Sequence, residues 1–156
     1  MRTRLVPLLF ATLLVSVGLL AVDDPLIGTW QLNLAKSKYN PGPPPKSQIL
    51  NYTPFGNKGL KVRAEIVDAQ GNKTVTEYSA NYDAKDYPVT GSPDADTVSM
   101  KHIDAATAER TYTKAGKVTT FARRAVSRDG KTLTITINGV NANGQRVNNV
   151  LVFDKQ

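Results

Sequence analysis

The chain has 156 residues, with 20 lysines and arginines against 13 aspartates and glutamates, one histidine, one tryptophan and no cysteine. This length corresponds to one ordinary domain. The lack of cysteine excludes disulfides, cysteine-ligated zinc and a thiol nucleophile, and a single histidine excludes a multi-histidine metal site. We therefore expect neither a metal nor another cofactor.

Residues 1–21 have the pattern of a secretory signal peptide. Two arginines precede a mostly apolar run from Leu5 to Leu20, which is followed by the small residue Ala21. A basic start, an apolar stretch and a small residue are the features of such a signal. An uncleaved anchor is the alternative, because the run is about long enough to span a bilayer. We predict a periplasmic or secreted domain over residues 22–156, without stable membrane insertion after cleavage.

The remainder of the chain has the alternation of apolar and polar residues that is typical of half-buried β-strands, and no segment has a sustained helical period. In the clearest case Leu133, Ile135 and Ile137 alternate with threonines. Turns rich in Gly, Asn and Asp separate many of the segments, as tight hairpins require. The predicted strands cover residues 29–34, 47–53, 60–66, 73–82, 96–103, 107–114, 118–127, 132–138 and 146–154.

Two segments interrupt this pattern. Residues 40–45 form a proline-rich link, which cannot be ladder-bonded strand. Residues 83–95 contain two prolines, and we expect a loop or a short edge strand there. The spacing predicts an all-β, antiparallel up-and-down meander of about 8–10 strands. Because a long open sheet leaves two unpaired edges, we predict a closed barrel, with a β-sandwich as the alternative.

Several short motifs carry a resemblance to known proteins. The predicted first strand contains Gly28-Thr29-Trp30-Gln31-Leu32-Asn33, and its Gly-x-Trp is similar to the signature of the lipocalin and fatty-acid-binding-protein superfamily. The chain resembles more closely the small exported bacterial lipocalin-like domains. The motifs that it shares with them are Ser37-Lys38, the prolines from Pro41 to Pro45, Tyr87 to Gly91, and Arg123 to Leu133.

The resemblance implies a lipocalin-like barrel that is closed at one end, where the tryptophan packs under a basic side chain from a late strand. Arg123 and Arg124 could supply that side chain, and alternation along a strand lets only one of them point inward. Gly28, Trp30 and Arg124 are the predicted barrel-end motif. The contact would be a cation–π pair.

Arg110 and Tyr112 are the first candidates for ligand binding. They lie two residues apart on one predicted strand and therefore share a face. In fatty-acid-binding proteins an Arg-x-Tyr pair binds a ligand carboxylate, so the resemblance implies the same role here. The alternative is an outward, solvated arginine beside an amphipathic tyrosine. Tyr78 could line the same cavity or simply fill the barrel.

His102 alternates with Val98 and Met100, so we predict that it faces inward, into the core or a ligand cavity. A haem or metal ligand is a further reading of a lone inward histidine. His102 is also the only general base that we would consider for a barrel enzyme, which is the weakest of the functional hypotheses.

The leading hypothesis is a non-enzymatic, exported protein that binds a small apolar or amphipathic, lipid-like ligand inside the barrel. Small residues at predicted inward positions favour it: Thr76, Ala80, Ala108, Thr120 and Ala122. The alternative is a structural or protein-interaction module with a filled core, whose surface would be the loops 40–46 and 83–95. The basic excess is mild and scattered, so we expect no nucleic-acid partner, and we expect a monomer.

Overall fold

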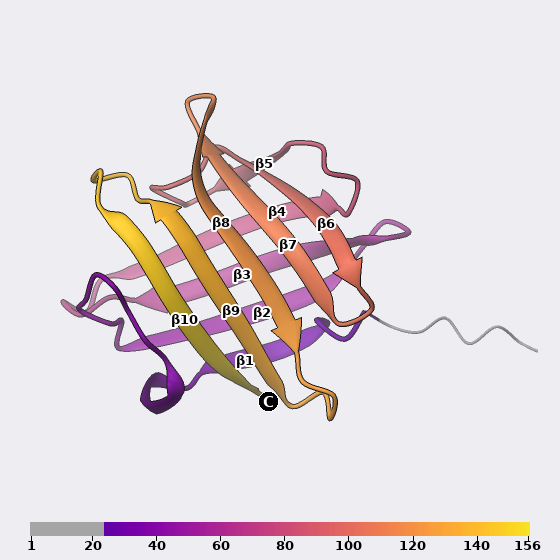
Figure 1. Cartoon of the computed structure of the whole chain (residues 1–156), viewed down its shortest axis with the longest axis horizontal. Helices are drawn as coiled ribbons and strands as arrows, with labels where there is room; N and C mark the ends of the chain where they lie inside the picture. Colours follow the sequence, from indigo (N-terminus) through magenta and orange to yellow (C-terminus); the bar gives the residue numbers. More distant parts are fainter. Residues whose placement is uncertain (1–23) are drawn as a thin grey trace, which may run out of the picture.

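The computed structural model of the protein describes residues 24–156, which form one closed antiparallel barrel (Figure 1). Each strand pairs with the next along the chain, and β1 pairs with β10 to complete the wall. The strands are β1 (Gly28–Leu32), β2 (Ser47–Phe55), β3 (Gly59–Val67), β4 (Lys73–Asn81), β5 (Tyr87–Thr90), β6 (Thr97–Asp104), β7 (Thr107–Lys114), β8 (Lys117–Val126), β9 (Thr132–Val140) and β10 (Arg146–Lys155).

The all-β fold class and the closed meander are as predicted, and closure excludes the sandwich alternative. Figure 1 shows β7 to β10 crossing in front of β1 to β4, which gives the barrel two layers whose strands run in different directions. The only helical element within residues 24–156 is the 3₁₀ turn η1 (Leu34–Lys36). No helix in this part of the chain is long and apolar enough to cross a membrane. The predicted signal peptide lies outside the described residues.

Two details differ from the predicted strand boundaries. The first strand ends at Leu32 rather than at residue 34, because the side chain of Asn33 accepts a hydrogen bond from the Lys36 backbone amide and caps η1. Residues 83–95 contain β5, which is a short strand but not an edge, since it pairs with β4 and β6. Pro88 lacks an amide hydrogen, which limits the length of this ladder.

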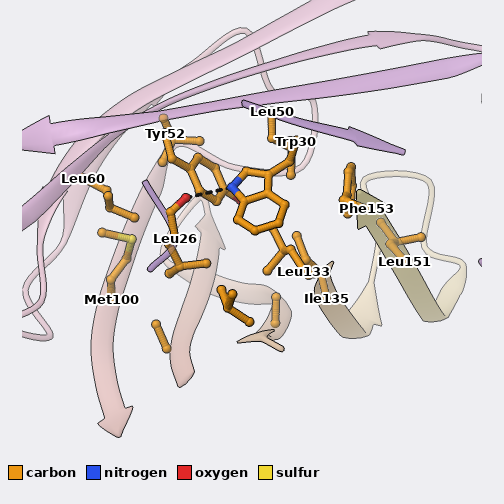
Figure 2. Close-up of a cluster of buried hydrophobic side chains, with 14 of the residues drawn as sticks. Leu26, Trp30, Leu50, Tyr52, Leu60, Met100, Leu133, Ile135, Leu151 and Phe153 are labelled. Carbon is orange, nitrogen blue, oxygen red and sulfur yellow. Dashed lines mark hydrogen bonds between the residues drawn. The ribbon is translucent and has the colours of Figure 1, made fainter. Parts of the chain in front are cut away.

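One end of the barrel is filled with apolar side chains. Trp30, Leu60, Leu133 and Phe153 are completely buried, and Leu26 from the segment before β1 packs among them (Figure 2). The indole Nε1 of Trp30 donates a hydrogen bond of 2.8 Å to the backbone carbonyl of Leu26. This bond satisfies the only polar atom of the indole, so the tryptophan closes the barrel without a buried unpaired group.

The basic side chain over Trp30 is Lys155, and the prediction that Arg123 or Arg124 would supply it is wrong. The Lys155 Nζ lies 5.0 Å from the centre of the indole ring. Lys155 is the direct cross-strand partner of Trp30 in the β1–β10 pair, whereas β8 is separated from β1 by two strands.

Gly28 makes room for this lysine. Its φ of +137° suits glycine, and a Cβ at this position would lie only 2.7 Å from the Cε of Lys155. The Gly-x-Trp motif therefore has a local physical reason. The glycine leaves room for the stem of Lys155 to cross the strand, and the indole ring of Trp30 lies beneath the lysine ammonium group.

We expect Lys155→Met to lower the free energy of unfolding by about 0.5–2 kcal/mol, because the variant keeps most of the apolar stem but loses the cation–π contact. Urea denaturation followed by tryptophan fluorescence and by circular dichroism would measure the change. Lys117→Met, on an exposed lysine at the opposite end of the barrel, is the matched control. An equal loss in the two variants would show that the contact with Trp30 contributes nothing.

Candidate ligand-binding cavity

The barrel is filled at the Trp30 end and hollow toward the other end. A cavity of about 510 Å³ extends from the middle of the barrel to the turns at that open end. The open end is formed by the proline-rich link and by the β3–β4, β5–β6 and β9–β10 connections, with Pro41, Pro43, Pro45, Ala69, Pro93 and Asn141 among the lining residues. Ligand sites in proteins commonly measure about 300–1,000 Å³, so the cavity has room for a small molecule.

Small residues opposite large ones create this space. Along the inner face of β7 and β8, Ala108 pairs with Arg124, Arg110 pairs with Ala122, and Tyr112 pairs with Thr120. Both alanines are completely buried. Thr76 and Thr120, two of the small inward residues predicted from the sequence, also line the cavity. Each long side chain can therefore extend over a short one instead of meeting another long side chain.

Arg110 lies inside the barrel, on the same face as Tyr112. Only 7% of its surface is exposed, and its guanidinium carbon stands 3.5 Å from the centre of the Tyr112 ring. The buried Nε of Arg110 has no hydrogen-bond partner among the described residues. Both side chains therefore face inward, which excludes the alternative of an outward, solvated arginine, and their role in binding stays a prediction.

Arg124 also points into the cavity, while its neighbour Arg123 is exposed. The Arg124 Nη2 donates a short hydrogen bond to the Tyr78 hydroxyl, and Nη1 contacts the Met100 sulfur at 3.6 Å. Its guanidinium carbon lies 5.3 Å from the centre of the Tyr52 ring. Like Arg110, Arg124 has a buried Nε without a partner within residues 24–156.

Tyrosine rings surround the two guanidinium groups. Tyr78 and Tyr112 meet edge to face, with 6.1 Å between the ring centres. Burial raises the pKa of Tyr52 to about 12, against the opposing effect of the Arg124 charge. Burial also raises the pKa of Tyr112. These two phenols are therefore neutral at physiological pH, and they add hydrogen-bonding groups but no negative charge.

His102 lies opposite the buried Ala108 on the inner face of the sheet, but the prediction that it lies in the core or in a ligand cavity is wrong. It is exposed, although its ring stacks on Tyr82 with 3.7 Å between the ring centres. The Tyr82 hydroxyl donates a hydrogen bond of 2.7 Å to Asp24 Oδ2. Beyond Met100, β6 extends past the filled core. Residues on the inner face of this part of the strand are therefore exposed. The residue that we considered as a general base is therefore away from the cavity.

Two tyrosines of the cavity were missed as site residues. Tyr52 lies on β2 in phase with Leu50, so alternation alone could have placed it inside. Tyr39 precedes the proline-rich link, where no period applies. Its buried hydroxyl has no partner among the described residues, and burial raises its pKa. No group of three or more potential metal-ligating side chains gathers within residues 24–156.

No protein-family model matches the sequence, and no curated protein is significantly similar to it in sequence. Solved structures are similar in shape. The wild-type fluorescent protein UnaG matches with a TM-score of 0.56 and 14% identity, over 84% of this chain and 97% of that chain. Its N57A mutant matches with the same TM-score and identity, over 85% and 96%. At this identity the likeness shows a shared fold alone, the closed antiparallel β-barrel.

The zebrafish ileal bile acid-binding protein complexed with cholic acid is a more distant match, with a TM-score of 0.48 and 12% identity over 85% of this chain and 99% of that chain. The closer resemblance to exported bacterial domains stays a prediction.

We expect Arg110→Met to raise the free energy of unfolding of the ligand-free protein by about 1–3 kcal/mol, because it removes a buried charge with an unpaired Nε. Thermal and urea denaturation would measure the change. Leu60→Ala is the comparison from the filled end, where we expect a loss of about 2–5 kcal/mol. A loss of stability in Arg110→Met would mean that its contact with Tyr112 outweighs the desolvation of the charge.

Proposed function

We propose that this protein is an exported, non-enzymatic binding protein that holds a small apolar or amphipathic molecule inside its barrel. The observation that carries the proposal is the cavity of about 510 Å³ with two buried arginines on its inner surface. Mostly apolar pockets with a few polar groups that fix the orientation of the ligand are typical of small-molecule sites.

The order of residues along the strands gives the direction in which an amphipathic ligand would enter. Arg124 lies on β8 two residues before the strand ends near the filled core, and Arg110 lies close to it on β7. Ile66 and Val147 lie near the open ends of β3 and β10 and also line the cavity. A polar head group would therefore enter first and reach the arginines, while the apolar tail would lie among the aliphatic side chains nearer the opening.

The alternative of an interaction module with a filled core receives less support. Its core would have to be packed throughout, whereas one half of the barrel holds a cavity of about 510 Å³. Tyr39, Arg110 and Arg124 line this cavity, and each has a buried polar atom without a partner within residues 24–156. Residues 41–45, which belong to its proposed surface, contribute three prolines to the lining of the cavity.

A titration of residues 22–156 with an environment-sensitive fluorescent fatty acid would test the binding function. We expect saturable binding to one site, with displacement by unlabelled fatty acid. We expect Arg110→Met to weaken binding at least about tenfold, because a charge-assisted hydrogen bond to the head group is lost.

Arg123→Met is the matched control, because Arg123 is exposed on the strand that carries Arg124, and we expect it to bind as the wild type does. Absence of saturable binding to protein that is folded by circular dichroism would overturn the proposal and favour the interaction module.

Export can be tested separately. We expect the full chain, expressed in a Gram-negative host, to accumulate in the periplasm as a shorter protein that lacks about the first 21 residues, as signal peptides of this kind are removed. Intact mass spectrometry of the periplasmic fraction would locate the cleavage site. Recovery of the uncleaved chain in the membrane fraction would instead identify residues 1–21 as an anchor.

A further inference from the structure

The inner part of the cavity contains two positive charges, Arg110 and Arg124, and neither forms an ion pair with a carboxylate of the described residues. Within residues 24–156 no aspartate or glutamate is buried. Arginine stays protonated in proteins, so both charges persist in the barrel. Buried charges are ordinarily paired, and this cavity departs from that rule twice.

The two carboxylates that line the cavity at its opening are already engaged in turns. Asp68 accepts hydrogen bonds from the backbone amides of Gly71 and Asn72, at 2.7 and 2.8 Å. Asp94 accepts a hydrogen bond of 2.6 Å from the Ala142 amide. Both sit at the open end, whereas the arginines lie deeper, so these carboxylates do not neutralise the guanidinium groups.

The tyrosines do not provide the missing charge either. Tyr52 has a pKa raised to about 12 by burial, and burial raises the pKa of Tyr112 in the same direction. The contacts that these rings make with the guanidinium groups are cation–π contacts, which leave the formal charge of the cavity unchanged.

The register of β7 and β8 places the two arginines close together. Arg110 is the cross-strand partner of Ala122, and Arg124 follows two residues later on the same face. Such diagonal neighbours have Cα atoms roughly 7–8 Å apart, which long side chains can bridge. One compact head group can therefore contact both guanidinium forks.

We propose that the head group of the ligand carries two negative charges, which balance Arg110 and Arg124. This inference rests on the proposed ligand-binding function and narrows it to dianionic amphiphiles. A phosphate monoester and a pair of neighbouring carboxylates share this chemistry, since each offers several acceptor oxygens to planar guanidinium donors.

Displacement of the bound fluorescent fatty acid by four compounds with apolar chains of eleven or twelve carbons would test the inference. The compounds are dodecyl phosphate, dodecylsuccinate, dodecanoate and dodecanol, compared at pH 8, where a phosphate monoester with a second pKa of about 6 carries two charges. We expect both dianions to bind at least about tenfold more tightly than dodecanoate, because a second charge-assisted contact is formed. We expect dodecanol to bind most weakly.

Single variants tie this preference to the two arginines. In Arg110→Met and in Arg124→Met we expect the preference for dianions over dodecanoate to fall below about threefold, since only one cation remains. Arg123→Met should keep the wild-type preference. Circular dichroism and urea denaturation would confirm that each variant is folded. If Arg124→Met does not fold, Arg110→Met alone decides the test.

The possible failures are distinguishable. If the probe binds and dodecanoate displaces it as well as the two dianions do, the inference is overturned and the proposed function stands. If the preference persists in Arg110→Met, the second charge is recognised elsewhere and the inference also fails. If no compound or probe binds to the folded protein, the proposed function itself is wrong. A difference between the two dianions would identify the phosphate or the dicarboxylate as the preferred source of charge.

Discussion

The pairing of β1 with β10 is the constraint on which the rest of the structure depends, because it joins the two ends of the sheet. Closure leaves no unpaired strand edge, and it gives every strand an inner and an outer face. The same pairing brings Trp30 opposite Lys155, and their cation–π contact covers the filled end of the barrel. One contact between the two ends of the described chain therefore decides both the topology and which half of the barrel is solid.

The contrast between the two halves follows from residue size. At the filled end, large apolar side chains such as Phe153 and Leu133 meet around the indole. On the inner face of β7 and β8, alanine or threonine lies opposite Arg110, Tyr112 and Arg124. A ten-stranded barrel is wide enough to hold either packed side chains or a small ligand, so this choice of residues, and not the number of strands, produces the cavity.

Much of this arrangement could be predicted from the sequence because alternation reports the face of a residue directly. It placed Arg110 and Tyr112 together, and it allowed only one of Arg123 and Arg124 to point inward. Alternation does not report where along its axis a barrel is filled. For this reason the sequence predicted His102 inside the core or cavity, whereas the residue lies beyond the end of the core. The contact of Lys155 with Trp30 depends on the register between the first and last strands, which no local pattern encodes.

The buried guanidinium groups connect stability with function. If stability of the core were the only requirement, methionine or leucine would be favoured at these inward positions, because an unpaired buried charge opposes folding. Residues that violate such rules are typical of functional sites, where the missing partner comes from a ligand. A ligand that supplies the missing charge binds the folded state and not the unfolded chain, so it restores the stability that the arginines remove. Under the proposed function, a ligand would complete the electrostatics of the barrel, and the apolar wall of the cavity would select its tail.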